Sequence, residues 1–410
     1  MLYEFRSGKE IADNLGIPQH GNPNISEDND LTPQPKLRLC YISNPNTVHA
    51  RRWVNWFAKR GHTVCLLADV PLKAPWTEIP VIDLSKIFYA PIIRFPVWTV
   101  WLRRYLHQWH PDILHAHRVN SAGWLAAASG FHPYVVTPWG SDVYRQPQRS
   151  RIARLLARYT LKHADLITAI SQAIGEQVIQ LGARAESLSR VQFGVELDIF
   201  SPDVPTNHES IDLRRRLSLP ENARLVLSAR AVHPIYNLDV ILQAIPLVRQ
   251  RFPEVIFIFL DYNTSPEYKT QLDAMIMELG LEAFIRWLPQ TNSRIEMAAL
   301  YRLSDVVVSV PTTDGTPVSV MEAMACGKPV VSTDLPSLRE FISSGENGCL
   351  VPVHQASSLA EAITQLLAQP DQAAEFGRRA HQVVVEKANL EVEMQHMEAL
   401  YYQLAGTRRR

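Results

Sequence analysis

Cysteine is scarce in this sequence, net charge is absent, and apolar segments are short. The four cysteines, Cys40, Cys65, Cys326 and Cys349, lie far apart in or beside apolar segments, and they form no Cys-x-x-Cys pair or His cluster with metal-ligand spacing. We therefore expect buried thiols in a reducing compartment and no metal site. The 41 basic residues balance the 41 acidic ones, which argues against a general nucleic-acid binder.

Targeting and membrane-spanning signals are also missing. No segment approaches the roughly 18 consecutive apolar residues of a membrane span, and the N-terminus lacks a basic start followed by an apolar stretch. The sequence therefore predicts a cytoplasmic protein.

Apolar segments alternate with helical patterns along most of the 410 residues, a length that suits two domains. Such alternation is typical of parallel sheets covered by helices on both faces, so we expect an α/β protein with two Rossmann-like, doubly wound domains. The predicted parts are a flexible N-terminal arm (1–36), a first domain (37–200), a linker (201–212), a second domain (213–375) and C-terminal helices that pack back on the first domain (376–410).

The segment TTDGTPVSVMEAMACGKPVV, residues 312–331, places the single carboxylate of Glu322 on an otherwise apolar helix. Thr316 suits the N-cap of this helix, Pro317 its first position, and Gly327 the left-handed residue that ends it. A buried carboxylate costs several kcal/mol unless it is paired. Its partner is either an Arg or Lys of the same domain or a ligand with paired hydroxyls.

Open α/β sheets bind ligands at the carboxyl ends of their strands, and this segment follows such a strand. Gly315 allows close approach of the backbone, and the amides of Thr316 to Ser319 form an anion site at a helix N-terminus. Asp314 can accept hydrogen bonds from a neutral polyol, and Glu322 from a vicinal diol. A phosphate site flanked by two such carboxylates is the pattern expected for a sugar nucleotide.

These residues resemble the retaining glycosyltransferases related to glycogen synthase, the "group 1" family. The family pattern is two glutamates separated by seven residues and followed by Ala-Met-Ala-x-Gly, and DGTPVSVMEAMACGKPVVSTD matches it with Asp314 at the first position. The segments HARRWVNWFAKRGHTV, PDILHAHRVNSAG, PWGSDVY, ADLITAIS, FGVELDIFSPD and GENGCLVP are similar as well.

The resemblance implies the GT-B fold, in which two Rossmann-like domains face each other across a cleft. It also implies that Glu322 holds the ribose of the donor, that Asp314 contacts the transferred sugar, and that His117 faces this sugar from the first domain. A histidine at a strand end can donate to a sugar oxygen or handle the proton of the acceptor, although it can equally be structural. We expect His115 to be structural.

The sequence departs from the family pattern at two loops. The family pairs an Arg with a Lys five residues later for the diphosphate, whereas ARAVHPIYNLD offers Arg230 and then Tyr236. The first loop lacks a glycine pair and carries Asn46, His49 and Arg52. The predicted donor-binding residues are Arg230, Tyr236, Asn237, Gly315, Thr316, Pro317, Ser319 and Glu322, the predicted acceptor-side residues are Asn46, His49, Arg52 and Asp142, and the catalytic ones are His117 and Asp314. Asp142 either orients the acceptor or stabilises its turn.

The sequence thus predicts a metal-independent retaining glycosyltransferase that moves a hexose from a nucleoside diphosphate sugar to a hydroxyl of a glycan or lipid-linked acceptor. No cofactor is expected besides this co-substrate. Alternatives are a nucleotide-sugar epimerase or phosphorylase on the same fold and a non-catalytic sugar-nucleotide-binding or scaffold protein. A dehydrogenase is disfavoured because no Gly-x-Gly-x-x-Gly follows a strand.

A basic amphipathic helix over residues 149–162 offers a second partner. Arg151, Arg154, Arg158 and Lys162 recur near helical spacing, with Ile152, Leu155, Leu156 and Tyr159 opposite them. The helix either contacts an anionic membrane peripherally at its cytoplasmic face or presents an ordinary solvated surface.

Overall fold

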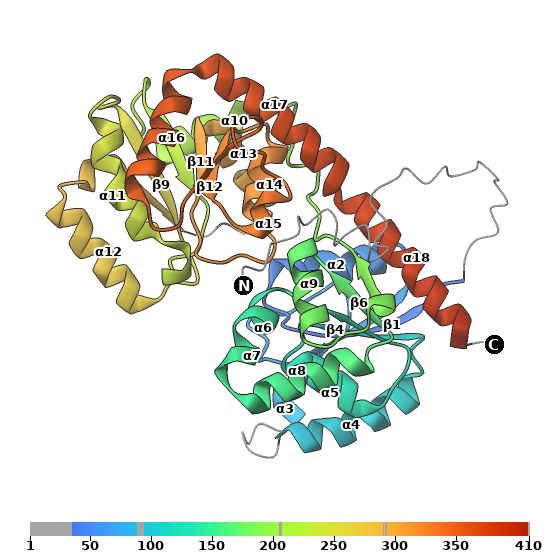
Figure 1. The fold of residues 1–410 in the computed structure, drawn as a ribbon. Helices are drawn as coiled ribbons and strands as arrows, with labels where there is room; N and C mark the ends of the chain where they lie inside the picture. Colours follow the sequence, from blue (N-terminus) through green and yellow to red (C-terminus); the bar gives the residue numbers. More distant parts are fainter. Residues whose placement is uncertain (1–34, 88–93, 205–206, 290, 292, 409–410) are drawn as a thin grey trace, which may run out of the picture.

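The computed structural model describes residues 35–87, 94–204, 207–289, 291 and 293–408. Nearly all of the predicted N-terminal arm, residues 1–34, lies outside the described residues, as do residues 205–206 of the predicted linker. The described chain forms two α/β units joined by the segment near residue 200 and by the C-terminal helices (Figure 1).

The first sheet is parallel throughout and has the strand order β3-β2-β1-β4-β5-β6-β7. Most of its strands are apolar and buried on both faces, as expected for a sheet covered by helices. Its strands are β1 (Arg38–Ser43), β2 (Thr63–Ala68), β3 (Val81–Asp83), β4 (Ile113–His117), β5 (Tyr134–Thr137), β6 (Leu166–Ala169) and β7 (Leu188–Arg190). The helices between them are α2 (Val48–Lys59), α3 (Leu84–Ile87), α4 (Arg94–Trp109), α5 (Ser121–Ser129), α6 (Ser141–Tyr144), α7 (Gln146–Arg149), α8 (Arg151–His163) and α9 (Gln172–Gln180).

The second sheet is also parallel and has the order β10-β9-β8-β11-β12-β13. Its strands are β8 (Arg224–Ser228), β9 (Val255–Asp261), β10 (Ile285–Pro289), β11 (Val306–Ser309), β12 (Val330–Thr333) and β13 (Cys349–Val351). Its helices are α10 (Asn207–Arg216), α11 (Leu238–Arg249), α12 (Pro266–Glu278), α13 (Arg294–Leu303), α14 (Val318–Ala325), α15 (Pro336–Arg339) and α16 (Ala356–Ala368). The predicted pair of Rossmann-like sheets is confirmed.

Both sheets reverse their strand order at an inner pair of strands, which is where doubly wound folds bind ligands. The reversal lies between β1 and β4 in the first sheet and between β8 and β11 in the second. His117 ends β4, and Arg230 and Asp314 follow β8 and β11. These three predicted site residues therefore lie at the two switch points.

The start of α14 differs from the prediction. Thr316 is not its N-cap: Pro317 holds that position without a side-chain cap, and the helix begins at Val318. The Thr316 hydroxyl instead donates to the carbonyl of Ile170 in the first domain. The end of the helix is as predicted, because Gly327 has φ of 69° and its N–H donates to the Met324 carbonyl.

The last two helices, α17 (Pro370–Lys387) and α18 (Leu390–Arg408), run from the second domain along the first (Figure 1). α17 packs on α14, whereas α18 packs on α2 and β4. Glu398 of α18 accepts hydrogen bonds from Arg60 (2.9 Å) and His62 (2.7 Å). Within the described residues, no helix is long and apolar enough to cross a membrane.

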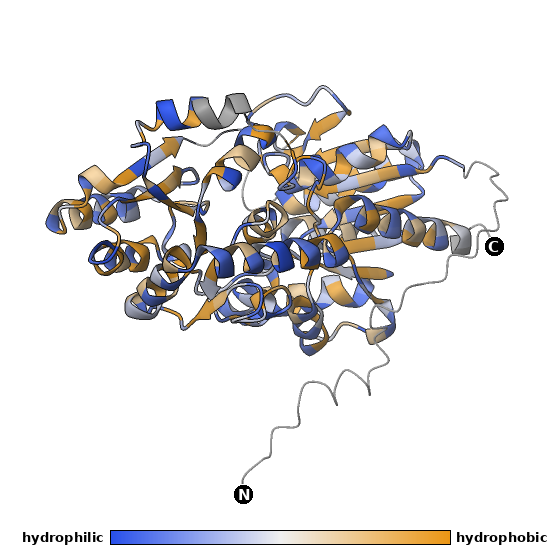
Figure 2. Ribbon diagram, turned by 90° about the horizontal axis from the view of Figure 1, so that it is seen from above, coloured by the Kyte–Doolittle hydropathy of each residue, from blue (hydrophilic) through white to orange (hydrophobic). Residues whose placement is uncertain are grey.

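Apolar residues fill the strands and the inward helix faces, while polar residues cover the outside (Figure 2). One core cluster fills the first domain and continues through Phe200 to Tyr301 and Met321 of the second. The two domains therefore share a core at the linker instead of being joined by chain alone.

Polar groups are buried in this core too, among them two histidines of β4. His115 bonds to Tyr401 (2.5 Å) and Thr137 (2.7 Å), the arrangement of a structural histidine. Burial lowers the pKa of His115, and burial together with nearby Arg118 and His49 lowers the pKa of His117 to about 3. Both rings are therefore neutral in the folded protein at neutral pH.

We expect these histidines to make the protein acid-sensitive. The unfolded chain binds the His117 proton near pH 6.5 and the folded chain only near pH 3, and the pKa of His115 is lowered as well, so stability present above pH 6.5 falls as the pH drops. Between pH 6.5 and 4.5, the free energy of unfolding measured with urea should fall with each pH unit by about 1.4 kcal/mol less for His117→Gln than for the wild type. The exposed His107→Gln is the control and should keep the wild-type slope. Equal slopes for all three proteins would contradict the assignment.

Candidate functional site

The switch point of the second sheet brings together Arg230, Asp314 and Ser319. The Arg230 guanidinium donates to the Asp314 carboxylate (2.8 Å) and to the Ser319 hydroxyl (2.9 Å), and it lies over the Tyr236 ring (4.1 Å). Burial alone would lower the pKa of Arg230, but Asp314 and Tyr236 more than offset this and raise it. This site therefore holds a permanent cation at the end of β8.

Asn237 shapes the neighbouring loop. It adopts a left-handed conformation (φ 48°, ψ 49°) before α11, and its side-chain amide donates to the Val310 carbonyl (2.7 Å) and to Thr312 (3.1 Å). It thereby ties the loop after β8 to the loop after β11. Tyr236 stands beside it and contributes a ring and a hydroxyl, but no charge.

The N-terminus of α14 faces the same point. In the described part of the chain, the N–H groups of Gly315, Thr316 and Ser319 have no protein acceptor. Pro317 contributes no N–H and occupies the N-cap. Unpaired amides at a helix N-terminus favour an anion, and Arg230 adds a full positive charge beside them.

Glu322 lies one turn into α14 and is 6% exposed. One carboxylate oxygen accepts from Arg294 Nη1 (2.8 Å), and the other accepts from the Tyr301 hydroxyl (3.2 Å). Of the two partners that the sequence leaves open, the structure contains the arginine. The ion pair does not exclude a diol, because each carboxylate oxygen offers two lone pairs.

Arg294 links Glu322 to the other domain. Its Nε donates to Glu196 Oε2 (2.9 Å), its Nη2 bonds the same oxygen, and its guanidinium lies 4.5 Å from the Phe200 ring centre. Arg52, one of the predicted acceptor-side residues, places its Nε 3.3 Å from Glu196 and donates from Nη2 to the Gly194 carbonyl (2.9 Å). Four alternating charges thus join the domains.

His117 lies at the switch point of the first sheet among aromatic rings. Its Nδ1 bonds the Ser43 hydroxyl (3.1 Å), whereas Nε2 has no partner among the described residues. The rings of Trp53 and Trp139 lie 5.4 and 5.5 Å away, and the indole N–H of Trp139 is buried without an acceptor in the described structure. An N–H donor is therefore available beside His117.

The other acceptor-side residues differ in their surroundings. Asn46 is exposed and holds its own loop, with hydrogen bonds to Pro71 and Lys73. The His49 ring stacks on Phe193 (4.7 Å) and lies beside Arg52, Trp53 and Leu390. Burial and nearby Arg52, Arg294 and Arg230 lower the pKa of His49 to about 3. His49 is therefore neutral and lies close to all three arginines.

Asp142 is buried, and its carboxylate is satisfied by its own loop and by the loop after β4. Its carboxylate accepts from the backbone N–H groups of Val119 (2.7 Å), Trp139 (3.0 Å) and Gly140 (2.8 Å). Burial raises its pKa despite these bonds. Asp142 thus fixes the loop that carries Trp139.

Loops of the two domains touch each other. Gly140 and Gly315 meet so closely that a Cβ on Gly315 would lie 2.8 Å from the Trp139 carbonyl oxygen. Thr316 donates to Ile170 (2.9 Å). These contacts place the loops after β5 and β6 directly against the segment that precedes α14.

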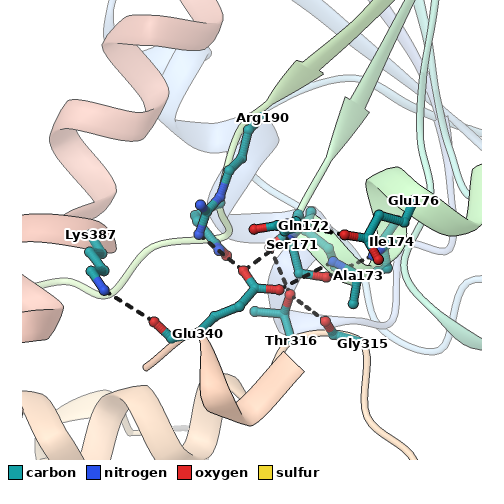
Figure 3. A network of polar contacts seen from close by, with 12 residues as sticks. Ser171, Gln172, Ala173, Ile174, Glu176, Arg190, Gly315, Thr316, Glu340 and Lys387 are labelled. Atoms are coloured by element: carbon teal, nitrogen blue, oxygen red, sulfur yellow. Dashed lines mark hydrogen bonds and ion pairs between the residues drawn. The ribbon is translucent and has the colours of Figure 1, made fainter. Parts of the chain in front are cut away.

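A second set of contacts centres on Glu340 (Figure 3). Its carboxylate, from the second domain, accepts from the N–H groups of Gln172 (3.2 Å) and Ala173 (3.3 Å) at the start of α9 and from Arg190 (3.1 Å). Lys387 donates to its carbonyl (3.2 Å). Burial raises the pKa of Glu340, and Arg190 only partly counteracts this. Glu340 thus holds the start of α9 and Arg190 against the second domain.

The structure groups Arg230, Tyr236, Asn237, Asp314, Ser319 and Glu322 in the second domain and His49, Arg52 and His117 in the first. Sequence reasoning missed Glu196, Arg294, Tyr301 and Trp139. Glu196 and Trp139 lie in segments with family resemblance, FGVELDIFSPD and PWGSDVY, which could have drawn attention to them. No local pattern marks Arg294, because its partners are distant in sequence.

Comparison with known proteins identifies matching families. The model of glycosyl transferases group 1 matches residues 209–383, and that of glycosyl transferase 4-like proteins matches residues 38–171. D-inositol 3-phosphate glycosyltransferases are similar: that of Xylanimonas cellulosilytica is 29% identical over 66% of this chain and 65% of its own length, and that of Gordonia bronchialis 26% over 66% and 61%. These matches span less than two thirds of either relative.

Solved structures share the whole architecture. Anabaena Alr3699/HepE in complex with UDP and glucose has a TM-score of 0.76, 19% identity and coverage of 90% of this chain and 100% of its own. Sucrose-phosphate synthase from Thermosynechococcus elongatus has a TM-score of 0.75, 19% identity and coverage of 91% and 100%. At such identities the likeness concerns the fold. With its two facing parallel sheets, its acidic motif and both family matches, the chain belongs to the group 1 glycosyl transferases of the GT-B fold.

Proposed function

We propose that the protein is a retaining hexosyltransferase that moves a sugar from a nucleoside diphosphate to a hydroxyl of a glycan or lipid-linked acceptor. One observation carries the proposal. Arg230, the unpaired amides that precede and begin α14, and two carboxylates converge at the switch point of the second sheet. This combination suits a diphosphate flanked by a sugar and a ribose.

We assign the donor to the second domain. Arg230 and the N–H groups of Gly315, Thr316 and Ser319 hold the diphosphate and stabilise the charge that develops on it as it leaves. Glu322 accepts the ribose hydroxyls, and Asp314 those of the transferred sugar. Anabaena Alr3699/HepE was solved with UDP and glucose, so UDP-glucose is the first donor to test.

His117 suits a hydrogen-bond donor better than a base. With a pKa of about 3 it binds a proton too weakly to deprotonate a hydroxyl at neutral pH. As the bond from sugar to diphosphate breaks and the bond to the acceptor oxygen forms, we expect the acceptor proton to pass to the departing phosphate oxygen. His117 Nε2 then donates to an oxygen of the sugar. No covalent intermediate with the protein is needed.

The acceptor side lies in the first domain near His49, Arg52 and Trp139. Stacked rings and N–H donors favour a hydroxyl-rich acceptor. The curated relatives are named for D-inositol 3-phosphate, so a phosphorylated polyol belongs in the test panel with glycans and lipid-linked sugars. A non-catalytic sugar-nucleotide-binding protein would bind the same donors but neither transfer nor hydrolyse the sugar.

Glu322→Ala should abolish most of the nucleotide-induced stabilisation. In a thermal-shift panel of UDP, GDP, ADP and CDP, we expect one nucleotide to stabilise the wild type by about 2.7 kcal/mol at a hundredfold excess over its Kd. The variant should gain little from the same nucleotide because it lacks the diol acceptor. Glu361→Ala, an exposed carboxylate on α16, is the control. If no nucleotide shifts the wild type, the donor assignment is wrong.

His117→Ala should chiefly slow turnover. Loss of one hydrogen-bond donor that acts in the transition state lowers kcat by about 100-fold, while KM for the donor changes little. Steady-state kinetics with the donor found in the panel measures both constants. An unchanged kcat, or a loss confined to KM, would remove His117 from the catalytic step.

A peripheral membrane contact through α8 forms part of this proposal. The helix buries Ala157, Thr160 and Leu161 and leaves Ile152 (70%), Leu155 (65%) and Tyr159 (41%) exposed. The predicted apolar stripe therefore lies in solvent beside the arginines instead of facing the core. An apolar stripe bordered by basic residues suits the interface of an anionic bilayer at the cytoplasmic side.

We expect the protein to sediment with phosphatidylserine-containing vesicles at low salt and to be released at high salt. Replacing Arg154 and Arg158 with Gln should weaken this binding about thirtyfold, since each basic residue contributes about 1 kcal/mol. Met277→Ser, which removes an exposed apolar side chain from α12, should leave it unchanged. Absence of wild-type binding at low salt would show that α8 is an ordinary solvated surface.

A further inference from the structure

Arg294 bridges the donor site and the end of the first domain. It is the first residue of α13, and its side chain is 24% exposed. Nη1 holds Glu322 (2.8 Å), whereas Nε (2.9 Å) and Nη2 hold the Glu196 carboxylate. Nη1, Nε and Nη2 belong to one planar guanidinium. The direction of the Glu322 bond is therefore fixed by the direction of the Glu196 bonds.

Glu196 belongs to the last part of the first domain, just before the linker. Its Oε2 also lies 3.3 Å from Arg52 Nε, and Arg52 is anchored to the Gly194 carbonyl (2.9 Å). The neighbouring Val195 is tied to α17 and α18 by bonds to Ala388 (2.7 Å) and Leu390 (3.1 Å). Any shift of the first domain therefore moves Glu196 relative to Arg294.

We propose that Arg294 is a positioning residue of the donor site, which orients the Glu322 carboxylate and couples donor binding to the closed arrangement of the domains through Glu196. The inference rests on the proposed function, because it takes Glu322 as the group that binds the donor. It adds a residue and a means of coupling that the donor assignment does not contain.

The coupling follows from the charges. With Glu196 and Glu322 both in place, Arg294 shares one positive charge between two carboxylates, and Arg52 supplies the second. An opening movement that carries Glu196 away would leave Arg294 with one partner and remove the constraint on Glu322. A donor that needs Glu322 in its held orientation therefore binds the closed form better, and its binding favours closure by the same factor.

Arg302 provides a matched control on the same helix. It also contacts the start of the linker, because its Nη1 donates to the carbonyls of Ile199 and Ser201 (3.1 Å each). No contact joins it to Glu322 in the described structure. A variant of Arg302 therefore weakens the attachment of the linker while leaving the Glu322 contacts in place.

The test is a double-mutant cycle read as nucleotide affinity. Isothermal titration with the nucleoside diphosphate that stabilises the wild type is performed on the wild type, Arg294→Gln, Glu322→Ala, the double variant and Arg302→Gln. We expect Arg294→Gln to weaken binding by between about 5-fold and 150-fold. In the Glu322→Ala background, the same substitution should weaken it no further, because Arg294 acts through Glu322. Arg302→Gln should bind as the wild type does.

The contact of Arg294 with the first domain is tested with Glu196→Gln, which leaves the Arg294–Glu322 pair intact. We expect weaker binding here as well, and a larger radius of gyration by small-angle X-ray scattering with saturating nucleotide. Circular dichroism checks the fold of each variant. If Arg294→Gln does not fold, Arg294→Lys and Glu196→Gln provide the test, since a lysine keeps the charge but loses the fork.

Two kinds of failure are distinguishable. If Glu322→Ala loses affinity while Arg294→Gln and Glu196→Gln keep that of the wild type, the coupling is refuted and the donor assignment stands. Additive losses in the double variant would refute it too, because Arg294 would then act independently of Glu322. If Glu322→Ala binds as the wild type does, the proposed function itself fails.

Discussion

The buried charge of Glu322 is the constraint from which much of the site follows. Its helix is apolar nearly all round because it packs against α13 and α17 as well as against β11 and β12, so the carboxylate has little access to bulk water and needs compensation by protein groups. Arg294 and Tyr301 provide this compensation. A guanidinium carried into the interior needs further partners in turn, and Glu196 and the Phe200 ring supply them. The need to neutralise one carboxylate thus extends to the linker.

The same reasoning applies on the other side of the interface at Glu340. Its raised pKa shows that burial costs more than Arg190 and the two N–H groups return, so this carboxylate does not favour closure simply through its charge. What it adds is geometry: three donors of the first domain fit one carboxylate of the second only in one relative placement. The apolar contacts near Phe200 supply the attraction between the domains, and the buried polar groups select one arrangement of them.

The fold was predictable from the sequence because it depends on local patterns. Alternating apolar segments indicated two parallel sheets, and both exist. The motif around Glu322 identified the loop at the second switch point, because Gly315 and Glu322 can be recognised from the residues next to them in the sequence. Thr316 was wrong as an N-cap because its hydroxyl bonds the first domain instead, a contact that no local rule includes. Arg294 was missed for the same reason: its carboxylate partners are 28 and 98 residues away.

The two switch points lie near each other only because the domains are in contact. Arg230 and Asp314 follow strands of one sheet, and His117 ends a strand of the other. The distance between the two strand ends is set instead by residues outside both sheets. These are Gly140, Gly315, Thr316, Glu340 and the row of four charges Arg52, Glu196, Arg294 and Glu322. The chemistry that the strand ends can perform is therefore controlled by the interface. Substitutions along that row should change donor binding even where they leave both domains fully folded.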